Sequence, residues 1–264
     1  MQRDLVQSVD RAMQILLAFD SEAQELSINE LSRRVRLSKS TVHRLLTTLA
    51  TRSFVEQNNQ NGKYRLGLAL YELGTQTILA RSFVAEAEPF LKEIVGLYGE
   101  TASLSVLEDI HSVIVEKFES SAALRLTSQI GRRSHLHTSA SGKVLLAYQP
   151  SPLQEELIAR LPLPRFTPNT ITDPRELKRH LAEIRRRGYA VDNEEVSEDL
   201  ICIGAPVFNH SGQVVAAISA SGLASRVRQA GVERIAATLV AAGLSISSRL
   251  GFSPEREGVE AEES

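Results

Sequence analysis

Several features are missing from this sequence, and each absence excludes a class of protein. Its 264 residues include one cysteine, Cys202, so no disulfide framework is indicated. No stretch approaches the roughly 20 apolar residues that span a bilayer. The start, Met1-Gln2-Arg3-Asp4, is not followed by the apolar region of a secretion signal. We therefore expect a cytoplasmic protein without a membrane partner.

The usual patterns for metals, nucleotides and covalent catalysis are also lacking. His135-Leu136-His137 and Cys202 offer candidate metal ligands, but none of the usual zinc-binding spacings surrounds them. Gly142-Lys143 lacks the other residues of a phosphate-binding loop, so we expect Lys143 to be solvated or paired structurally. Ile201 and Ile203 flank Cys202 and indicate a buried thiol rather than a nucleophile. We expect no metal, no cofactor and no catalytic residue.

What the sequence does contain is a segment, residues 33–65, whose charge is nearly all of one sign. Eight basic residues stand there against the single acid Glu56, a local net charge of +7 in a chain of net charge −2. Residues 1–66 carry +3 and the remainder −5. Such a basic block is the electrostatic signature of a surface that binds a polyanion, although a merely solvated basic face has the same composition.

Local sequence signals within this block predict a helix-turn-helix. Ser27 and Glu30 fit a capping box, which predicts the start of one helix, and Ser38 is the N-cap candidate of a second. In the second helix, apolar residues from Val42 to Leu49 form one stripe, which leaves the polar N-terminal residues on the open side. There a recognition helix contacts bases and phosphates. The candidate contacts are Ser38, Lys39, Ser40, Thr41, His43 and Arg44.

A hairpin and a further helix complete the predicted DNA-binding module. The alternating segments 54–57 and 63–66, joined by a turn with Asn61-Gly62, predict a wing whose Lys63 and Arg65 lie along the phosphate backbone. Upstream, we expect Ser8 to cap a helix that packs against the other two. Its expected packing residues are Val9, Ala12, Met13, Leu16 and Leu17.

The chain is too long for this module alone and suits one further domain. Residues 67–82 are apolar and free of proline, which predicts a linker helix that also pairs with a partner subunit through Leu70, Leu73 and Ile78. Beyond Phe83, about five mainly antiparallel strands with helices around them predict an α+β domain. The expected strands are 101–107, 111–118, 189–192, 200–208 and 213–221, and the expected helices are 84–97, 139–148, 173–188 and 225–250.

Six motifs follow one another along nearly the whole chain: Ser38–Leu46, His137–Ala147, Thr167–Asp173, Gly188–Asp192, Ala205–Phe208 and Ser219–Gly222. Together they resemble the IclR family of bacterial transcription regulators. The resemblance implies a winged helix-turn-helix at 1–66, a linker helix at 67–82 and a GAF- or PAS-like α+β domain at 83–254 that binds a metabolite and oligomerises. We expect the acidic tail, 255–264, to be disordered. The implied partners are double-stranded operator DNA, a small-molecule effector and the chain itself, as a dimer or tetramer.

The resemblance also implies an effector pocket for a small polar or carboxylate metabolite. The residues that it places there are Ala140, Ser141, Asp192, Cys202, Ser219 and Ser221. Independently, Ser219 and Ser221 are two apart on a strand and share a face, and amides at the start of the Ser141 helix suit a carboxylate. For the serines alone, a satisfied sheet face is the alternative. Ser141 stands where many relatives carry a small or apolar residue, which makes the pocket rim more polar.

A second class of function stays open at this point. The alternative is an enzyme that acts on a small carboxylate through His137, Asp192 and Cys202 and carries an appended DNA-binding domain. The two classes predict different results in a turnover assay against carboxylate metabolites.

Overall fold

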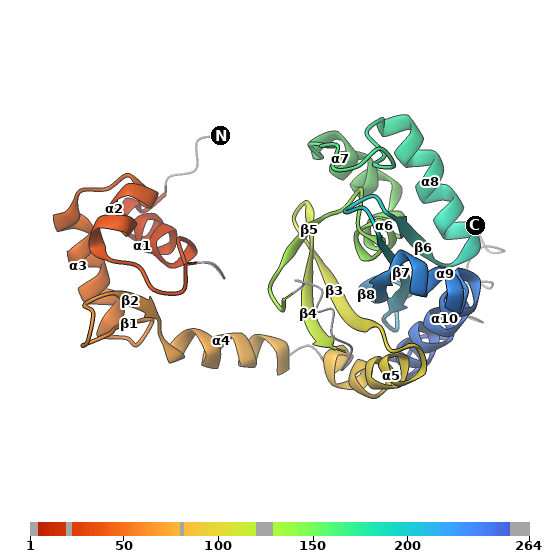
Figure 1. The fold of residues 1–264 in the computed structure, drawn as a ribbon, viewed down its shortest axis with the longest axis horizontal. Helices are drawn as coiled ribbons and strands as arrows, with labels where there is room; N and C mark the ends of the chain where they lie inside the picture. Colours follow the sequence, from red (N-terminus) through yellow and green to blue (C-terminus); the bar gives the residue numbers. More distant parts are fainter. Residues whose placement is uncertain (1–4, 20–22, 80–81, 120–128, 254–264) are drawn as a thin grey trace. The chain divides into compact units, whose positions relative to one another are not determined.

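The chain forms two compact units, Met1–Ala80 and Arg81–Ser264, each described by itself (Figure 1). The structure, a computed structural model, describes residues 5–19, 23–79, 82–119 and 129–253. The predicted acidic tail, 255–264, lies outside these residues.

The first unit is a helix-turn-helix with a two-stranded wing, as the sequence predicts. The Ser27–Glu30 capping box is present: the Ser27 amide donates to the Glu30 carboxylate at 2.8 Å, and the Glu30 amide donates to Ser27 Oγ at 3.3 Å. Val42, Leu31 and Leu46 are fully buried in a core shared by the helices and the hairpin. The elements are α1 (Gln7–Leu17), α2 (Ile28–Val35), α3 (Lys39–Ala50), β1 (Val55–Gln57), β2 (Tyr64–Leu66) and α4 (Leu68–Leu79).

The prediction for the first helix was wrong in its cap and in most of its packing face. Helix α1 begins at Gln7 after Val6, which makes no side-chain cap, so Ser8 lies inside the helix. Ile15 is the residue that α1 buries completely. Val9, Met13 and Leu17 recur every four residues on another face, and their exposed fractions are 52%, 57% and 82%.

The second unit is built on a six-stranded antiparallel sheet, one strand more than expected. The additional strand is β5, which pairs with β4 at one edge. The spatial order is β5-β4-β3-β8-β7-β6, so β3 and β8 are neighbours although they are distant in sequence. The strands are β3 (Thr101–Glu108), β4 (His111–Phe118), β5 (Arg133–His135), β6 (Ala190–Asn193), β7 (Leu200–Phe208) and β8 (Val214–Leu223).

Helices cover both faces of this sheet (Figure 1). Helices α5 (Ser82–Tyr98) and α10 (Val232–Arg249) pack on one face and contact each other. Helix α6 (Ala140–Ala147) packs on the other, with α8 (Pro174–Arg187) outside it. Helix α7 (Ser151–Arg160), which the sequence did not lead us to expect, follows α6.

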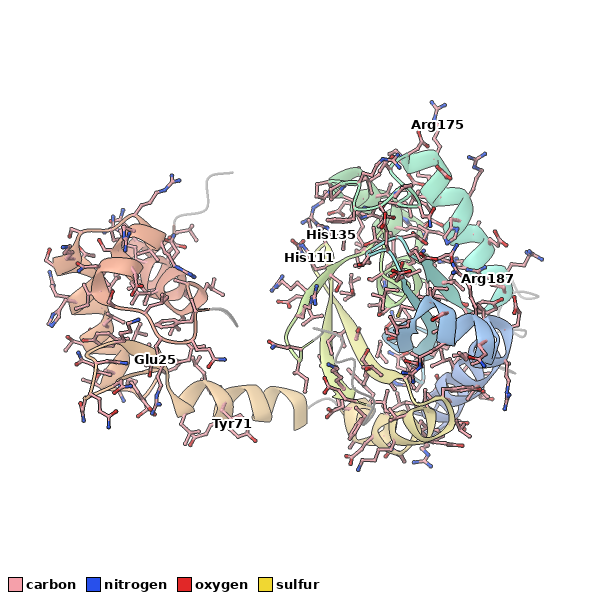
Figure 2. The ribbon with its side chains drawn as sticks, in the orientation of Figure 1. Glu25, Tyr71, His111, His135, Arg175 and Arg187 are labelled. Atoms are coloured by element: carbon pink, nitrogen blue, oxygen red, sulfur yellow. The ribbon has the colours of Figure 1, made fainter. Side chains whose placement is uncertain are left out.

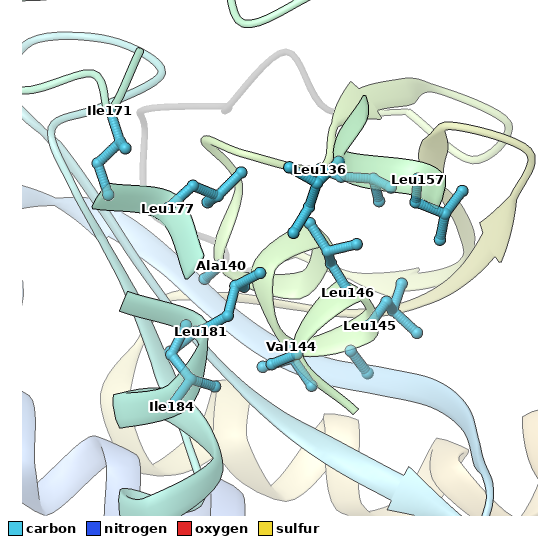
Figure 3. Close-up of a cluster of buried hydrophobic side chains, with 14 of the residues drawn as sticks. Leu136, Ala140, Val144, Leu145, Leu146, Leu157, Ile171, Leu177, Leu181 and Ile184 are labelled. Atoms are coloured by element: carbon cyan, nitrogen blue, oxygen red, sulfur yellow. The ribbon is translucent and has the colours of Figure 1, made fainter. Parts of the chain in front are cut away.

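Helix α6 lies between the sheet and α8, and all of its residues are buried. Ser139 caps it by accepting a hydrogen bond from the Gly142 amide at 3.1 Å. Leu177, Leu181 and Ile184, spaced as one stripe of α8, pack toward α6 residues such as Val144 in a continuous core (Figure 3). This packing fixes the α6 N-terminus, which lies beside the cavity described below.

The long final helix predicted at 225–250 is in fact two helices. Helix α9 (Ala224–Ala230) ends before Gly231, whose φ of 92° interrupts the helix, and α10 begins at Val232. No single described helix is long and apolar enough to cross a membrane; α9 and α10 meet both conditions only as a pair, and the pair is bent by 79°.

Candidate DNA-binding and effector sites

The polar N-terminal residues predicted for base contact lie together at the start of α3. Ser38 is the N-cap and accepts from the Thr41 amide at 3.3 Å, and its hydroxyl also lies 2.9 Å from that of Thr41. Lys39, Ser40, His43 and Arg44 are exposed, while Thr41 is half-buried. The opposite face of α3 buries Val42 and Leu46, so the helix presents a polar, basic end to solvent.

The wing carries its predicted basic residues, together with acids that reduce their charge. Arg65 stands opposite Glu56 in the hairpin and donates to its carboxylate at 3.0 and 3.2 Å. Glu25 accepts from the side chains of Asn58 and Asn61 in the turn, which lowers the pKa of Glu25. A phosphate at Arg65 must therefore compete with Glu56. Lys63 is half-buried on the same hairpin.

The second unit contains a cavity of about 450 Å³ bounded by the sheet, the start of α6 and the connection from β6 to β7. Asp192 in β6 pairs with Cys202 in β7, which pairs with Ser221 in β8. Directly paired residues of neighbouring strands place their side chains on the same face. These predicted residues thus form one row across three strands, and all of them line the cavity.

Ser219 belongs to the next row of the sheet, beside the α6 N-terminus. It pairs with Gly204 in β7 and with Ser103 in β3. A Cβ atom at Gly204 would lie 3.1 Å from the Ala140 carbonyl carbon and 3.2 Å from the Ser141 amide nitrogen, so glycine lets α6 approach the sheet. Ser219 and Ser141 line the cavity; Ala140 is fully buried and does not.

Both predicted serines of β8 have hydrogen-bond partners within the sheet. The Ser219 hydroxyl lies 3.1 Å from that of Ser103, and Ser221 donates to the Cys202 sulfur at 2.9 Å. They are satisfied, as the alternative interpretation predicts, and they also face the cavity.

Sequence reasoning missed much of the hydroxyl lining. Nine serines line the cavity, and none of the described lining residues is aromatic. Ser103 and Ser105 are among them. Their alternation with Leu104 in an expected strand was a usable signal that they share one face.

Asp192, an acid that lines the cavity, has a raised pKa. Burial raises its pKa to about 7, against the attraction of nearby Lys143. Its Oδ1 accepts from the amides of Glu195 at 2.7 Å and Val196 at 3.3 Å. Burial, with Asp192 close by, raises the pKa of the Cys202 thiol to about 12. The thiol is therefore neutral at physiological pH and is a poor nucleophile.

Lys143 is paired rather than solvated, the second of the two states expected for it. Its side chain is fully buried in α6 and forms an ion pair with Glu195. Its Nζ also donates to the Val191 carbonyl at 2.6 Å. Burial lowers the pKa of Lys143, and the Glu195 carboxylate opposes that shift.

The histidines form a separate cluster of aromatic rings. His111 and His135 are paired across β4 and β5, with ring centroids 6.0 Å apart (Figure 2). Strand β5 ends at His135, so His135 and His137 do not lie on one strand. His137 Nε2 lies 3.1 Å from the Pro164 carbonyl, and its ring packs near Phe166. Among the described residues, no group of three ligands is arranged to hold a metal.

The geometry gives no support to the enzyme alternative. Asp192 and Cys202 line the cavity, but His137 does not. The described residues therefore place no imidazole of the proposed trio beside the neutral thiol.

Family models match both units of the chain. The model described as "IclR helix-turn-helix domain" matches residues 8–59, and the one described as "Bacterial transcriptional regulator IclR C-terminal" matches 75–248. The transcriptional regulator XynR of Escherichia coli K12 is 39% identical over 248 residues, covering 94% of this chain and 98% of the relative. KdgR of Dickeya chrysanthemi is 38% identical, covering 95% of this chain and 82% of the relative.

Solved structures show the same architecture. The crystal structure of Thermotoga maritima IclR has a TM-score of 0.77 and 31% identity, and covers 94% of this chain and 100% of that one. An IclR homolog from Microbacterium hydrocarbonoxydans, complexed with 4-hydroxybenzoate, has a TM-score of 0.83 and 29% identity, covering 92% of this chain and 98% of that one. The winged helix-turn-helix, the α+β second unit and these matches together show that the chain belongs to the IclR family of bacterial transcriptional regulators.

Proposed function

We propose that this regulator reads its operator through the N-terminal end of α3 and changes its DNA affinity when a hydroxylated carboxylate fills the cavity of the second unit. The observation that carries the proposal is the polar row of Asp192, Cys202 and Ser221 beside the start of α6, inside a cavity of about 450 Å³. Its place of action is the cytoplasm, where it meets operator DNA.

The start of α6 suits the carboxylate end of such an effector. The cap occupies the Gly142 amide; of the first-turn amides before it, that of Ser141 belongs to a residue that lines the cavity, whereas Ala140 does not line it. Helix N-termini bind anions through such amides. The bound 4-hydroxybenzoate of the Microbacterium homolog, a carboxylate with a hydroxyl, supports this class of effector.

The serine lining and Asp192 suit the hydroxyl or keto groups of the effector. A neutral Asp192 can donate to a ligand oxygen, and an ionised one can accept from a ligand hydroxyl. An anionic carboxylate directly beside an ionised Asp192 would be repelled. We therefore place the carboxylate at α6 and a hydroxyl near Asp192.

The first unit offers apolar surface for a partner subunit. Leu68 and Tyr71 of α4 are 61% and 71% exposed. Leu70 is half-buried and Leu73 is exposed, whereas the side chain of Ile78 lies outside the described residues. Exposed apolar residues grouped in this way favour a docking surface, and we propose that α4 and the first unit contribute to a dimer or tetramer.

Base readout and phosphate contact should respond differently to mutation. Arg44→Ala should weaken operator binding by about 1 to 3 kcal/mol and relax sequence specificity, because a bidentate base contact is lost. Lys63→Ala should weaken all DNA sequences alike and reduce the salt slope by about one unit. Fluorescence anisotropy at several salt concentrations measures both. Arg186→Ala, an exposed arginine of α8, is the matched control, and unchanged binding in both test variants would refute the assignment.

The assembly should be at least a dimer, since one recognition helix covers only one half-site. Light scattering of the full chain should give a mass of two or more subunits. Leu68→Glu with Tyr71→Glu should weaken operator binding by charging the proposed interface, whereas Leu97→Glu, at a residue 58% exposed in the second unit, should not. A wild-type monomer that still binds its operator would contradict the proposal.

The effector response should depend on the β8 hydroxyls. We expect Ser219→Ala with Ser221→Ala to abolish the change in operator affinity caused by the active member of a panel of small hydroxy and keto acids. Binding of ligand-free protein to DNA should persist, because coupling requires differential contacts in the cavity. Ser151→Ala with Ser245→Ala, two exposed hydroxyls elsewhere in the second unit, is the control. A normal response in the double variant would place the pocket elsewhere.

Asp192 should make folding stability depend on pH. Because its pKa is raised from near 4 to about 7, the neutral form stabilises the fold at low pH, and this contribution is lost as pH rises through 7. The free energy of unfolding should fall by about 1 kcal/mol between pH 6 and pH 8 relative to Asp192→Asn. Urea titrations at both pH values measure it, and parallel pH profiles for the two proteins would rule out the raised pKa.

A further inference from the structure

One wall of the cavity is the connection between β6 and β7, residues 194–199, here called the 194–199 wall. Four of its residues, Val196 to Asp199, line the cavity. Its end residues, Glu194 and Asp199, have φ values of 60° and 61°, which residues other than glycine rarely adopt. Backbone of this kind persists only where surrounding contacts hold it.

A buried ion pair supplies one such contact. Lys143, from α6, pairs with Glu195, and the exposed fractions of the two side chains are 0% and 6%. The second carboxylate oxygen of Glu195, Oε2, is buried without a hydrogen-bond partner. Neither residue is among those that line the cavity. The pair therefore joins the wall to α6 from behind the effector site.

Further hydrogen bonds, from Asp192 and from two threonines, also hold the 194–199 wall. Asp192, which faces the cavity, accepts from the amides of Glu195 and Val196. Thr167 donates to the Glu194 carbonyl at 2.6 Å, and Thr170 donates to the Glu195 carbonyl at 2.7 Å. The motif around Thr167 thus braces the first residues of the wall.

We propose that Lys143 and Glu195 are positioning residues of the effector pocket, which hold the 194–199 wall against α6 and so control access to the cavity. The inference rests on the proposed effector role of the cavity. A buried lysine–glutamate pair contributes little net stability compared with apolar residues of similar volume. What the pair adds is a fixed position for residue 195 relative to the helix that carries Ser141.

The only cysteine of the chain provides a native reporter of access, because Cys202 lines this cavity. We would measure its alkylation by iodoacetamide in the full-length protein at one fixed pH, with thermal melting in parallel. In Lys143→Met with Glu195→Leu, both charges are removed, so no unpaired charge is left to unfold the domain. This variant should be alkylated about tenfold faster than the wild type while its melting temperature is retained.

The loss of the positive charge of Lys143, considered by itself, predicts slower alkylation of Cys202. Lys143 lowers the pKa of the Cys202 thiol, so its removal should reduce the thiolate fraction and slow alkylation. The matched control is Lys178→Met with Glu155→Leu, which removes an exposed ion pair between α8 and α7 and should leave the alkylation rate unchanged.

Lys143→Met with Glu195→Gln is the second variant; it also removes both charges, and it keeps the length of the side chain at position 195. Hydrogen exchange at the amides of Glu195 and Val196 should be at least about tenfold faster in it, with the sheet still protected. Wild-type alkylation and exchange rates in both variants would overturn the proposal. Increases in exchange rate that spread over the whole domain, in proportion to a lower free energy of unfolding, would also overturn the proposal. Because no effector is needed, failure here is distinguishable from failure of the Ser219 and Ser221 test.

Discussion

The fold of the second unit depends on how the buried positive charge of Lys143 is compensated. Lys143 is completely buried in α6, and an unpaired ammonium there would be strongly destabilising. The protein offsets that charge with Glu195 and the Val191 carbonyl, both of which belong to β6 or the segment after it. Asp192 lies close enough for Lys143 to lower its pKa, yet burial still raises that pKa to about 7. One buried cation therefore organises the pocket wall and the most perturbed acid of the cavity.

Helix α6, which carries Lys143, both packs in the core and borders the cavity. Its apolar side packs against α8 in the core, and its N-terminus lies over Gly204 beside the row of Asp192, Cys202 and Ser221. A rigid support of this kind keeps polar groups in place before a ligand arrives. The first unit has its own core and its own polar surface. A regulator needs both DNA contact and metabolite contact, and each unit is suited to one of them.

Much of this was predictable from sequence where the signals were local. The capping box at Ser27, the cap at Ser38 and the helix expected to start at residue 173 are all present. The prediction of a helix cap at Ser8 was wrong because a serine near an apolar stripe resembles a cap, while the real helix boundary at Val6 has no side-chain signal. The break at Gly231 was missed because apolar residues continue on both sides of it. The alternation of Ser103 and Ser105 with Leu104 indicated a shared face, but only the pairing of β3 with β8 brings Ser103 beside Ser219. The partner of Lys143 was unpredictable for the same reason: Glu195 is far from it in sequence.

Operator-specific regulation is tested most directly by selecting fragments of the source genome with the full-length protein and sequencing the fragments that it retains. An oligomeric regulator of this kind should retain a small set of fragments that share a sequence repeated with twofold symmetry, with half-sites separated by about 10 base pairs or a multiple. Neighbouring genes in those fragments should then indicate the metabolite. Retention of fragments with no common sequence, in proportion to their abundance, would contradict the claim that this chain is an operator-specific regulator.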